Sequence, residues 1–362
     1  MKNIVANNAD YPDITKSKEL LQRAEGLIPA YSQTLAKGPG QYVKGIAPVY
    51  AAKGKGTHIW DVDGNEYLDY NMAIGPLSLG YCFEEVDNAI IDQLKDGITF
   101  SLPHALEVEV AELIREVVPN AESVRYSKTG ADVTSAAVRL SRAFTGRNNV
   151  LCCGYHGWHD WYIAVTDRNK GIPTVAQDLT FTFNYNDIQS VIDAIDDDTA
   201  CVILEPFVFQ NQEEDFLKKL RAICDEKGVL LIFDEMWTGF RIALGGAQEY
   251  FGVRADLAVF SKAIANGMPI SVITGRKDVM QLLEKEVFFF TTFGGEALSL
   301  AAAKTTINFM KEHNVAQALN DKGVLLKEGY NAIAEELGIS SYTSCSGYNC
   351  RTIISFNASA GN

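Results

Sequence analysis

The feature that most constrains the fold is an alternation of helical and strand-like segments between residues 107 and 275. Amphipathic helical periodicity alternates there with short apolar runs. The helical stretches are 107–118, 132–144, 187–195 and 213–227, and the apolar runs are 150–154, 200–206, 229–235, 257–261 and 271–275. Strands that alternate with helices predict an α/β fold with a mainly parallel sheet covered by helices on both faces.

The flanking segments predict additional parts. A short helix is expected over 17–27, and a β-hairpin with an Asp-Gly turn over 58–70. Two long helical patterns, 296–312 and 315–336, precede a last β-like segment at 349–356. We expect three parts: an N-terminal segment (1–70), a large domain (71–300) and a smaller, C-terminally incomplete α+β domain (301–362).

Composition and charge exclude several classes of protein. The chain has 362 residues, of which 47% are apolar, too many for a disordered protein. Its 46 acidic and 32 basic residues give a net charge of −14, which argues against a nucleic-acid partner. There is no run of about 18 apolar residues and no apolar leader, so we expect no membrane association and a cytoplasmic location.

The seven cysteines have neither the spacing of a zinc site nor that of a disulfide framework. Three of them, Cys152, Cys201 and Cys224, lie in apolar stretches. We expect these three to be small core residues.

Two charged side chains follow predicted strands. Asp234 ends the run VLLIFDE, and Lys262 follows LAVFS and precedes a turn-rich segment. The carboxyl ends of parallel strands are where α/β folds bind ligands. Taken singly, Asp234 is better explained as a turn cap and Lys262 as a solvated surface charge.

A strand, a glycine-containing turn and a helix are predicted in succession over 126–146. The N-terminus of such a helix offers unpaired N–H groups and a positive dipole end, which suit a phosphate. Asp132 in the first turn is equally compatible with a simple helix cap. Both interpretations stay open from this motif alone.

The segment CGYHGWHDW (153–161) follows a predicted strand. Its aromatic side chains suit stacking on a planar heterocycle. His156 and His159 lack a third metal ligand nearby, so no metal site is expected. Packing in the core or at an interface is the expected role of Trp158 and Trp161.

Taken together, these motifs resemble the class III, fold-type I pyridoxal-phosphate (PLP) aminotransferases, and among them the glutamate-1-semialdehyde 2,1-aminomutase-like branch. The resemblance covers nearly the whole chain. The motifs, in family order, are DVDGNEYLDY, GPLSLGY, GADVTSAAVRLSRAFTGR, GYHGWHDW, EP, LLIFDEMWTGFR, SKAIANGMP and TTFGGEALSLAAA. The resemblance implies a fold-type I transferase with PLP as cofactor.

The resemblance also implies roles for individual residues. Lys262 would form a Schiff base with PLP and then move protons, and Asp234 would face the pyridine nitrogen. The remaining cofactor contacts would be Tyr155 and Met236 on the two ring faces, Gly130 and Ala131 at the phosphate, Glu205 at the rim, and Thr292 at the phosphate in a neighbouring subunit. The last role implies a homodimer with shared active sites.

The sequence departs from the family pattern at several places. Ala131 replaces the usual Ser or Thr, and the loop after Glu205 is short, which leaves Gln210 and Asn211 as alternatives for a family asparagine. The aminomutase has an arginine in its N-terminal segment that binds the substrate carboxylate. The corresponding residues 31–40 contain no arginine, and their one basic residue, Lys37, cannot form a bidentate clamp. Family members also continue beyond the position of Asn362.

We therefore expect an enzyme that moves an amino group between a small-molecule amino donor and a carbonyl acceptor. An aminomutase that isomerises a single compound is the alternative within the family. A PLP-binding but catalytically idle partner subunit is the alternative of another class.

Overall fold

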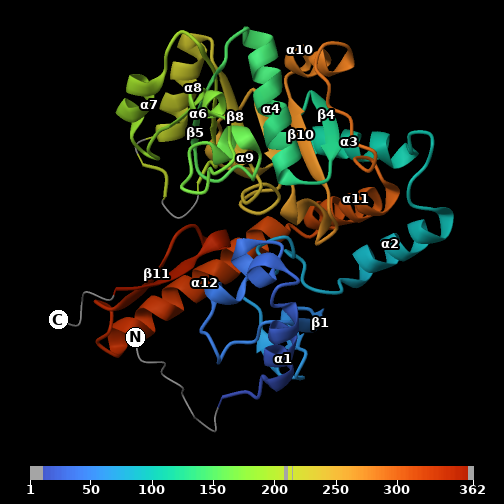
Figure 1. Cartoon of the computed structure of the whole chain (residues 1–362), viewed down its shortest axis with the longest axis vertical. Helices are drawn as coiled ribbons and strands as arrows, with labels where there is room; N and C mark the ends of the chain where they lie inside the picture. Colours follow the sequence, from blue (N-terminus) through green and yellow to red (C-terminus); the bar gives the residue numbers. More distant parts are fainter. Residues whose placement is uncertain (1–10, 208–210, 214, 358–362) are drawn as a thin grey trace. The chain divides into compact units, whose positions relative to one another are not determined.

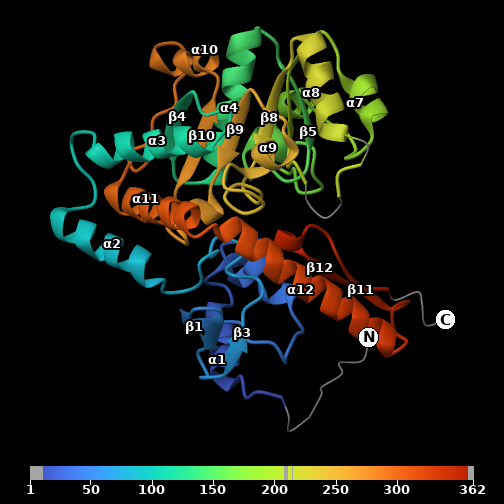
Figure 2. The ribbon, with the colours of Figure 1, turned by 180° about the vertical axis from the view of Figure 1, so that it is seen from behind.

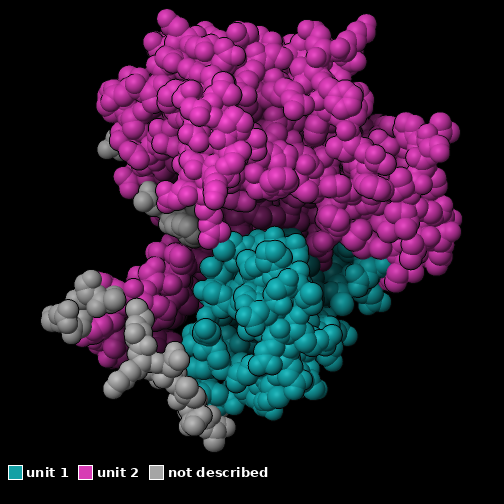
Figure 3. Space-filling model, in the orientation of Figure 1, with its two compact units in different colours: residues 1–87 teal, residues 88–362 magenta. Residues whose placement is uncertain are grey.

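The computed structural model describes residues 11–207, 211–213 and 215–357. The chain forms two compact units, residues 1–87 and residues 88–362 (Figure 3). The three-part division expected from the sequence stays a prediction.

The first unit contains a short helix and a small antiparallel sheet. The helix is α1 (Thr15–Ala24), and the sheet has the order β1 (Ala51–Lys55), β2 (His58–Asp61) and β3 (Glu66–Leu68). The predicted hairpin is confirmed, since β2 pairs with β3. Asp61 accepts hydrogen bonds from the backbone N–H groups of Asp63 and Asn65 inside the turn. Asp63 in turn accepts two from the first turn of α1, which helps to fix where that helix begins.

The second unit is built on a seven-stranded sheet with the order β4-β10-β9-β8-β7-β5-β6. Its strands are β4 (Ser123–Ser127), β5 (Asn149–Cys153), β6 (Thr180–Thr182), β7 (Thr199–Leu204), β8 (Leu230–Asp234), β9 (Leu257–Phe260) and β10 (Ser271–Gly275). The neighbouring pairs β6–β5, β5–β7, β7–β8 and β8–β9 are parallel. Strand β10 runs antiparallel to both of its neighbours, β4 and β9. The predicted mainly parallel sheet is thus confirmed, and β4 and β10 add a mixed edge.

Helices cover both faces of this sheet, as predicted. In Figure 1 α4 lies in front of the strands, and in the reverse view of Figure 2 the strands and α8 lie in front of α4. The helices around the sheet include α3 (Ala105–Val117), α4 (Gly130–Thr145), α7 (Ile188–Ala194) and α8 (Phe216–Lys227). Helix α2 (Glu84–Asp96) has no counterpart among the predicted elements. Cys152, Cys201 and Cys224 are fully buried, which confirms them as core residues.

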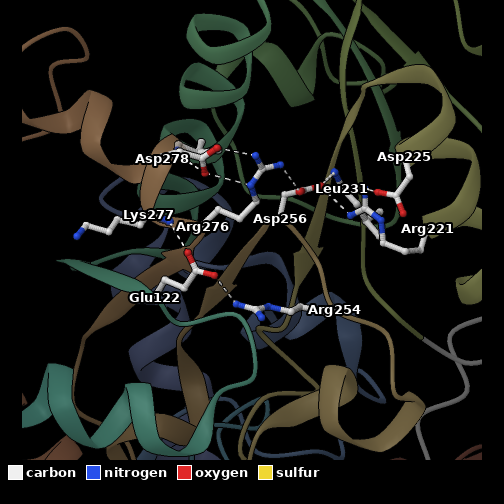
Figure 4. Close-up of polar contacts among 10 residues, drawn as sticks. Glu122, Arg221, Asp225, Leu231, Arg254, Asp256, Arg276, Lys277 and Asp278 are labelled. Atoms are coloured by element: carbon white, nitrogen blue, oxygen red, sulfur yellow. Dashed lines mark hydrogen bonds and ion pairs between the residues drawn. The ribbon is translucent and has the colours of Figure 1, made fainter.

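A buried carboxylate ties the amino ends of β8 and β9 together (Figure 4). Asp256 accepts a hydrogen bond of 2.8 Å from the Leu231 N–H and pairs with Arg221 at 2.7 Å and Arg276 at 2.9 Å. These contacts join the beginnings of β8 and β9, α8 and the end of β10. They stabilise the sheet at the end opposite to Asp234.

The C-terminal part of the second unit contains two long helices and a short hairpin. Helices α11 (Ala297–Glu312) and α12 (Val315–Glu336) confirm the two predicted helices. The β-like segment predicted over 349–356 is confirmed only in its second half. That segment is a 3-10 turn (Asn349–Arg351) followed by β12 (Ile353–Phe356), which pairs with the unpredicted β11 (Thr343–Ser346). Among the described residues no helix is long and apolar enough to cross a bilayer.

Candidate active site

Five of the six strands of the large sheet that end at one edge lead into the site. Since β10 is antiparallel to both β4 and β9, β4 points the same way as β5, β7, β8 and β9. The residues that follow these strands line a cavity of about 440 Å³. Seven of the eight predicted site residues lie there together: Gly130, Ala131, Tyr155, Glu205, Asp234, Met236 and Lys262.

Asp234 ends β8 and is held by a buried histidine. Its Oδ2 lies 2.8 Å from His156 Nδ1, and the two side chains are 2% and 0% exposed. His156 Nε2 lies 3.1 Å from the carbonyl oxygen of Cys153. Both partners of the ring can accept hydrogen bonds, so His156 lies between two acceptors and orients the Asp234 carboxylate. The Met236 N–H donates to the other carboxylate oxygen at 3.1 Å.

Lys262 follows β9 with a left-handed backbone, φ +47°, which is strained for a residue with a side chain. Its Nζ lies 4.1 Å from the centroid of the Trp237 indole ring. Burial lowers the pKa of Lys262 from its ordinary value of 10.5 to about 8, although Asp234 and Glu205 oppose the shift. A buried amine that titrates near neutrality is available in its neutral, nucleophilic form.

The N-terminus of α4 forms another wall of the cavity. Thr129 caps the helix, and Asp132 accepts hydrogen bonds from the Thr129 N–H and the Ser127 hydroxyl, which confirms its role as a helix cap. Gly130 and Ala131 are in the first turn, where N–H groups have no acceptor within the helix. This end of α4 therefore presents N–H donors and a positive dipole end to the cavity, so the cap leaves room for the anion site, which stays a prediction.

Glu205 follows β7 and links two parts of the cavity wall. Its Oε1 accepts the Tyr155 N–H at 2.9 Å, and its Oε2 lies 3.9 Å from Nη1 of Arg351. Burial and the nearby Asp234 raise the pKa of Glu205, and the Arg351 guanidinium acts in the opposite direction.

Other predicted residues lie elsewhere. Thr292 is exposed in the loop before α11 and does not line this cavity, so its role stays a prediction. Asn211 is exposed, and Gln210 lies outside the described residues. Lys37 is an exposed residue of the first unit, where it lines a separate cavity of about 750 Å³.

The aromatic residues after β5 have different environments. Trp161 is buried in the core, as expected. The core interpretation is wrong for Trp158, which is 69% exposed and lines the active-site cavity, and its interface role stays a prediction. Tyr155 is 64% exposed and lines the same cavity.

Several residues that line the cavity are not among the predicted site residues, and three of them bear on its chemistry. The HxxH spacing of His156 and His159 suggests only a metal ligand, but the position of His156 two residues after Gly154, at a strand end, is a usable signal. Trp237 follows Met236 directly in the DEMW motif. Arg351 comes from a distant 3-10 turn, and no local pattern in the sequence marks it.

This set of residues fits a flat, phosphorylated, electron-withdrawing ring. The α4 N-terminus suits a phosphate, Tyr155 and Met236 line the cavity with an aromatic ring and a thioether, and the Asp234–His156 pair supplies a buried carboxylate for a protonated ring nitrogen. Lys262 supplies an amine for a carbonyl group.

The class-III aminotransferase family matches residues 42–341. The chain belongs to this family. Over 343 residues it is 37% identical to glutamate-1-semialdehyde 2,1-aminomutase of Archaeoglobus fulgidus, covering 89% of this chain and 80% of that protein. Over 336 residues it is 35% identical to 3-aminobutyryl-CoA aminotransferase of Cloacimonas acidaminovorans, covering 90% and 80%.

Solved structures of other proteins share this fold. The PLP internal aldimine form of the FumI protein of Sphingopyxis sp. MTA144 matches with a TM-score of 0.89 and 31% identity over 96% of this chain and 84% of that one. An omega-transaminase of Sphaerobacter thermophilus matches with a TM-score of 0.86 and 27% identity over 94% and 83%. The predicted family, the fold-type I architecture and PLP as the cofactor of this enzyme are thereby confirmed.

Proposed function

We propose that this class-III aminotransferase moves an amino group between an amino donor and a carbonyl acceptor, with Lys262 as the residue that carries the cofactor. The observation behind this proposal is that one cavity holds the partly buried Lys262 amine and the buried Asp234–His156 pair. PLP, when bound, supplies an aldehyde for amines and a ring that accepts the electron pair released at the substrate carbon.

The residues of this chain then have distinct tasks. Lys262, whose pKa is about 8, binds and releases a proton at Nζ near neutral pH and so serves as both base and acid. Asp234, oriented by His156, holds the proton on the ring nitrogen. Gly130 and Ala131 orient the phosphate through backbone N–H groups, and Glu205 fixes the Tyr155 backbone at the rim.

The test is cofactor attachment followed by turnover. Wild-type protein should take up PLP and become yellow, and borohydride should fix the cofactor to a peptide that contains Lys262. The Lys262→Ala variant should bind PLP without covalent attachment. A wild-type protein that never takes up PLP would refute the proposal, and loss of visible absorbance with an amino donor would exclude an idle subunit.

An aminomutase is the second candidate, because one curated relative at 37% identity carries that activity in its name. A transaminase releases a keto acid from the donor, whereas a mutase isomerises one compound without an acceptor. Chromatography of the products from a single labelled donor distinguishes the two activities.

We also propose a homodimer in which Thr292 contacts the phosphate held by the partner subunit. Exposed aromatic side chains on either side of Thr292 support an interface there: Phe288, Phe290 and Phe293 are each more than half exposed. Light scattering should give twice the chain mass of 39.7 kDa, and Thr292→Val should weaken PLP binding about tenfold.

The seven free thiols are consistent with a cytoplasmic location.

A further inference from the structure

The loop that precedes α11, residues 288–296, is fixed to the protein at both ends. We call it the Thr292 loop, after the residue proposed to contact the phosphate held by the partner subunit. At its beginning, Arg139 and Arg125 donate hydrogen bonds of 2.7 Å and 3.0 Å to backbone carbonyl groups of the loop. Residues 291–293 in its middle are exposed. The first anchor therefore comes from α4, whose N-terminus faces the cavity, and from β4, the strand before it.

Lys128 fixes the other end of the loop. It lies between β4 and α4, two residues before the first residue of α4, and its side chain is 21% exposed. Its Nζ lies 2.6 Å from Glu296 Oε1, 2.9 Å from the Pro269 carbonyl oxygen and 3.1 Å from the Ser299 hydroxyl. An ammonium group has three N–H bonds, and these three acceptors use all of them. Lys128 is therefore held in one place and can hold the end of the loop there.

Glu296 joins this contact to the first turn of α11. Its carboxylate oxygens accept the backbone N–H groups of Leu298 and Ser299, at 2.8 Å and 3.0 Å, so it caps the helix. Although burial acts in the opposite direction, hydrogen bonds from Lys128 and Ser299 lower the pKa of Glu296, so the ion pair with Lys128 persists near neutral pH. One lysine beside the N-terminus of α4 thus fixes where the loop ends and α11 begins.

Close packing leaves this end of the loop little freedom. A Cβ at Gly294 would lie 2.9 Å from the Tyr126 carbonyl oxygen, which is closer than an ordinary contact. A Cβ at Gly295 would lie 2.7 Å from the Glu107 carboxylate carbon. The backbone can approach β4 and α3 this closely because both residues are glycine. Thr292 lies two residues before Gly294, so a shift of this end of the loop would move its side chain.

We propose that Lys128 is a positioning residue for the partner subunit's active site: through Glu296 it fixes Thr292 against the phosphate of the cofactor bound there. This inference rests on the proposed aminotransferase function and on the proposed homodimer. Lys128 is not among the described residues that line the cavity of its own subunit. Its loss should therefore weaken PLP binding mainly in the other subunit.

The N-terminus of α4 does not depend on this ammonium group. Thr129 and Asp132 form a reciprocal cap, in which the side chain of each accepts the backbone N–H of the other, and Ser127 donates its hydroxyl to Asp132. None of these bonds includes the Lys128 ammonium. Its removal should therefore leave the α4 N-terminus of the same subunit in place while it releases the Thr292 loop.

The experiment uses mixed dimers in which only one subunit can be labelled. Two differently tagged chains are co-expressed and purified on both tags in sequence. The reporter chain keeps Lys262, and the silent chain carries Lys262→Ala. Brief borohydride treatment at increasing PLP concentrations gives the concentration for half-maximal covalent labelling of the reporter chain. Lys128→Met is placed either in the silent chain or in the reporter chain.

Two further variants accompany Lys128→Met in both placements. Glu296→Gln keeps an acceptor for the first turn of α11 but removes the charge that holds Lys128. Lys304→Met is the matched control, because Lys304 of α11 also forms a 2.6 Å ion pair with a glutamate, Glu109, but that glutamate lies outside the loop. Each mixed dimer carries one copy of the variant, so a general loss of stability would affect both placements equally.

We expect Lys128→Met in the silent chain to raise the half-labelling concentration roughly 3- to 10-fold, with the effect of Thr292→Val as the upper bound because it acts through Thr292. In the reporter chain the increase should be less than about twofold. Added to Thr292→Val in the silent chain, Lys128→Met should have less than about a twofold further effect, since the contact is already lost. Glu296→Gln should show the same dependence on placement with a smaller effect, and Lys304→Met should change neither.

Equal effects in the two placements, a larger effect in the reporter chain, or full additivity with Thr292→Val would overturn the proposal. So would a silent chain in which Thr292→Val weakens labelling and Lys128→Met does not, and in that case the homodimer and the aminotransferase function stand. Chains that do not co-purify, or a Thr292→Val change without effect, would refute the proposed homodimer contact and this inference with it. A wild-type protein that borohydride never labels would refute the aminotransferase function.

Discussion

The Lys262 side chain should lower the free energy of unfolding of the cofactor-free protein. Replacing Lys262 should show by how much. Burial lowers the pKa of Lys262 from 10.5 to about 8. At 1.36 kcal/mol per pH unit, that difference corresponds to about 3 kcal/mol of unfavourable free energy when the amine is protonated in both the folded and unfolded states. Lys262→Met removes this cost and keeps a side chain of similar length, so the variant should be about 3 kcal/mol more stable at pH 7.

The pH dependence distinguishes this cause from better packing. The unfolded chain holds the Lys262 proton up to about pH 10.5, whereas the folded chain releases it near pH 8. The cost is therefore fully present below pH 8 and disappears as the pH rises to 10.5, so the advantage of the variant should shrink to near zero at that pH. Urea unfolding of both cofactor-free proteins at pH 7 and pH 10.5 measures this difference in stability between the variant and the wild type. A gain that is equal at both pH values, or no gain at pH 7, would refute the reasoning.

Lys128→Met is the matched control for this prediction. Lys128 pairs with Glu296 at 2.6 Å and donates to the Pro269 carbonyl and the Ser299 hydroxyl. Because this lysine has good partners for its charge, its loss should lower stability at pH 7. Opposite signs for the two Lys→Met changes would show that the environment of the ammonium, and not the added methionine, decides the result.

Three other changes have expected outcomes. His156→Leu leaves a buried carboxylate without its imidazole partner and should lower the free energy of unfolding in urea by about 3–5 kcal/mol, while His156→Gln, which keeps one donor, should lose less. Asp256→Asn should cost about 2–4 kcal/mol in the same assay, since it removes the buried anion of Arg221 and leaves that arginine only the exposed Asp225, and an unchanged midpoint would contradict this. Gly157→Ala should weaken PLP binding at least about tenfold in an absorbance titration, because φ is +102° and its Cβ would lie 2.7 Å from the Ala131 Cβ at the α4 N-terminus; unaltered affinity would contradict it.

The large sheet could be predicted because its strands are buried on both faces. Runs such as 200–206 and 229–235 are continuously apolar, and the helices between them have clear periodicity. The C-terminal hairpin could not be predicted in the same way. Segment 349–356 mixes polar and apolar residues, and its first half forms a turn because α12 packs against it at Gly323. That contact is tertiary, so no local pattern in the sequence records it.

The site residues also fall into two groups: those that local sequence patterns predict and those that depend on tertiary contacts. Asp234 and Lys262 end or follow apolar strands, and the topology of a parallel sheet brings such positions to one edge. The partnership of His156 with Asp234 depends on how the chain turns after β5, which the HxxH spacing does not reveal. Arg351 is 89 positions beyond Lys262 and enters through a turn held by another helix. Its place in the cavity therefore required the folded structure.

The charge of this cavity also shows what net charge can and cannot decide. The chain carries −14 overall, which argues against nucleic-acid binding, but most of that charge is spread over a surface screened within about 10 Å at 0.1 M salt. Inside the cavity the effective dielectric constant is lower, so nearby groups dominate. Lys262, Arg241 and Arg351 lie around one indole ring, and burial raises the pKa of the nearby Glu205, which favours its neutral form. With the positive end of α4 added, an acidic protein presents a cationic pocket, which is what a phosphorylated cofactor requires.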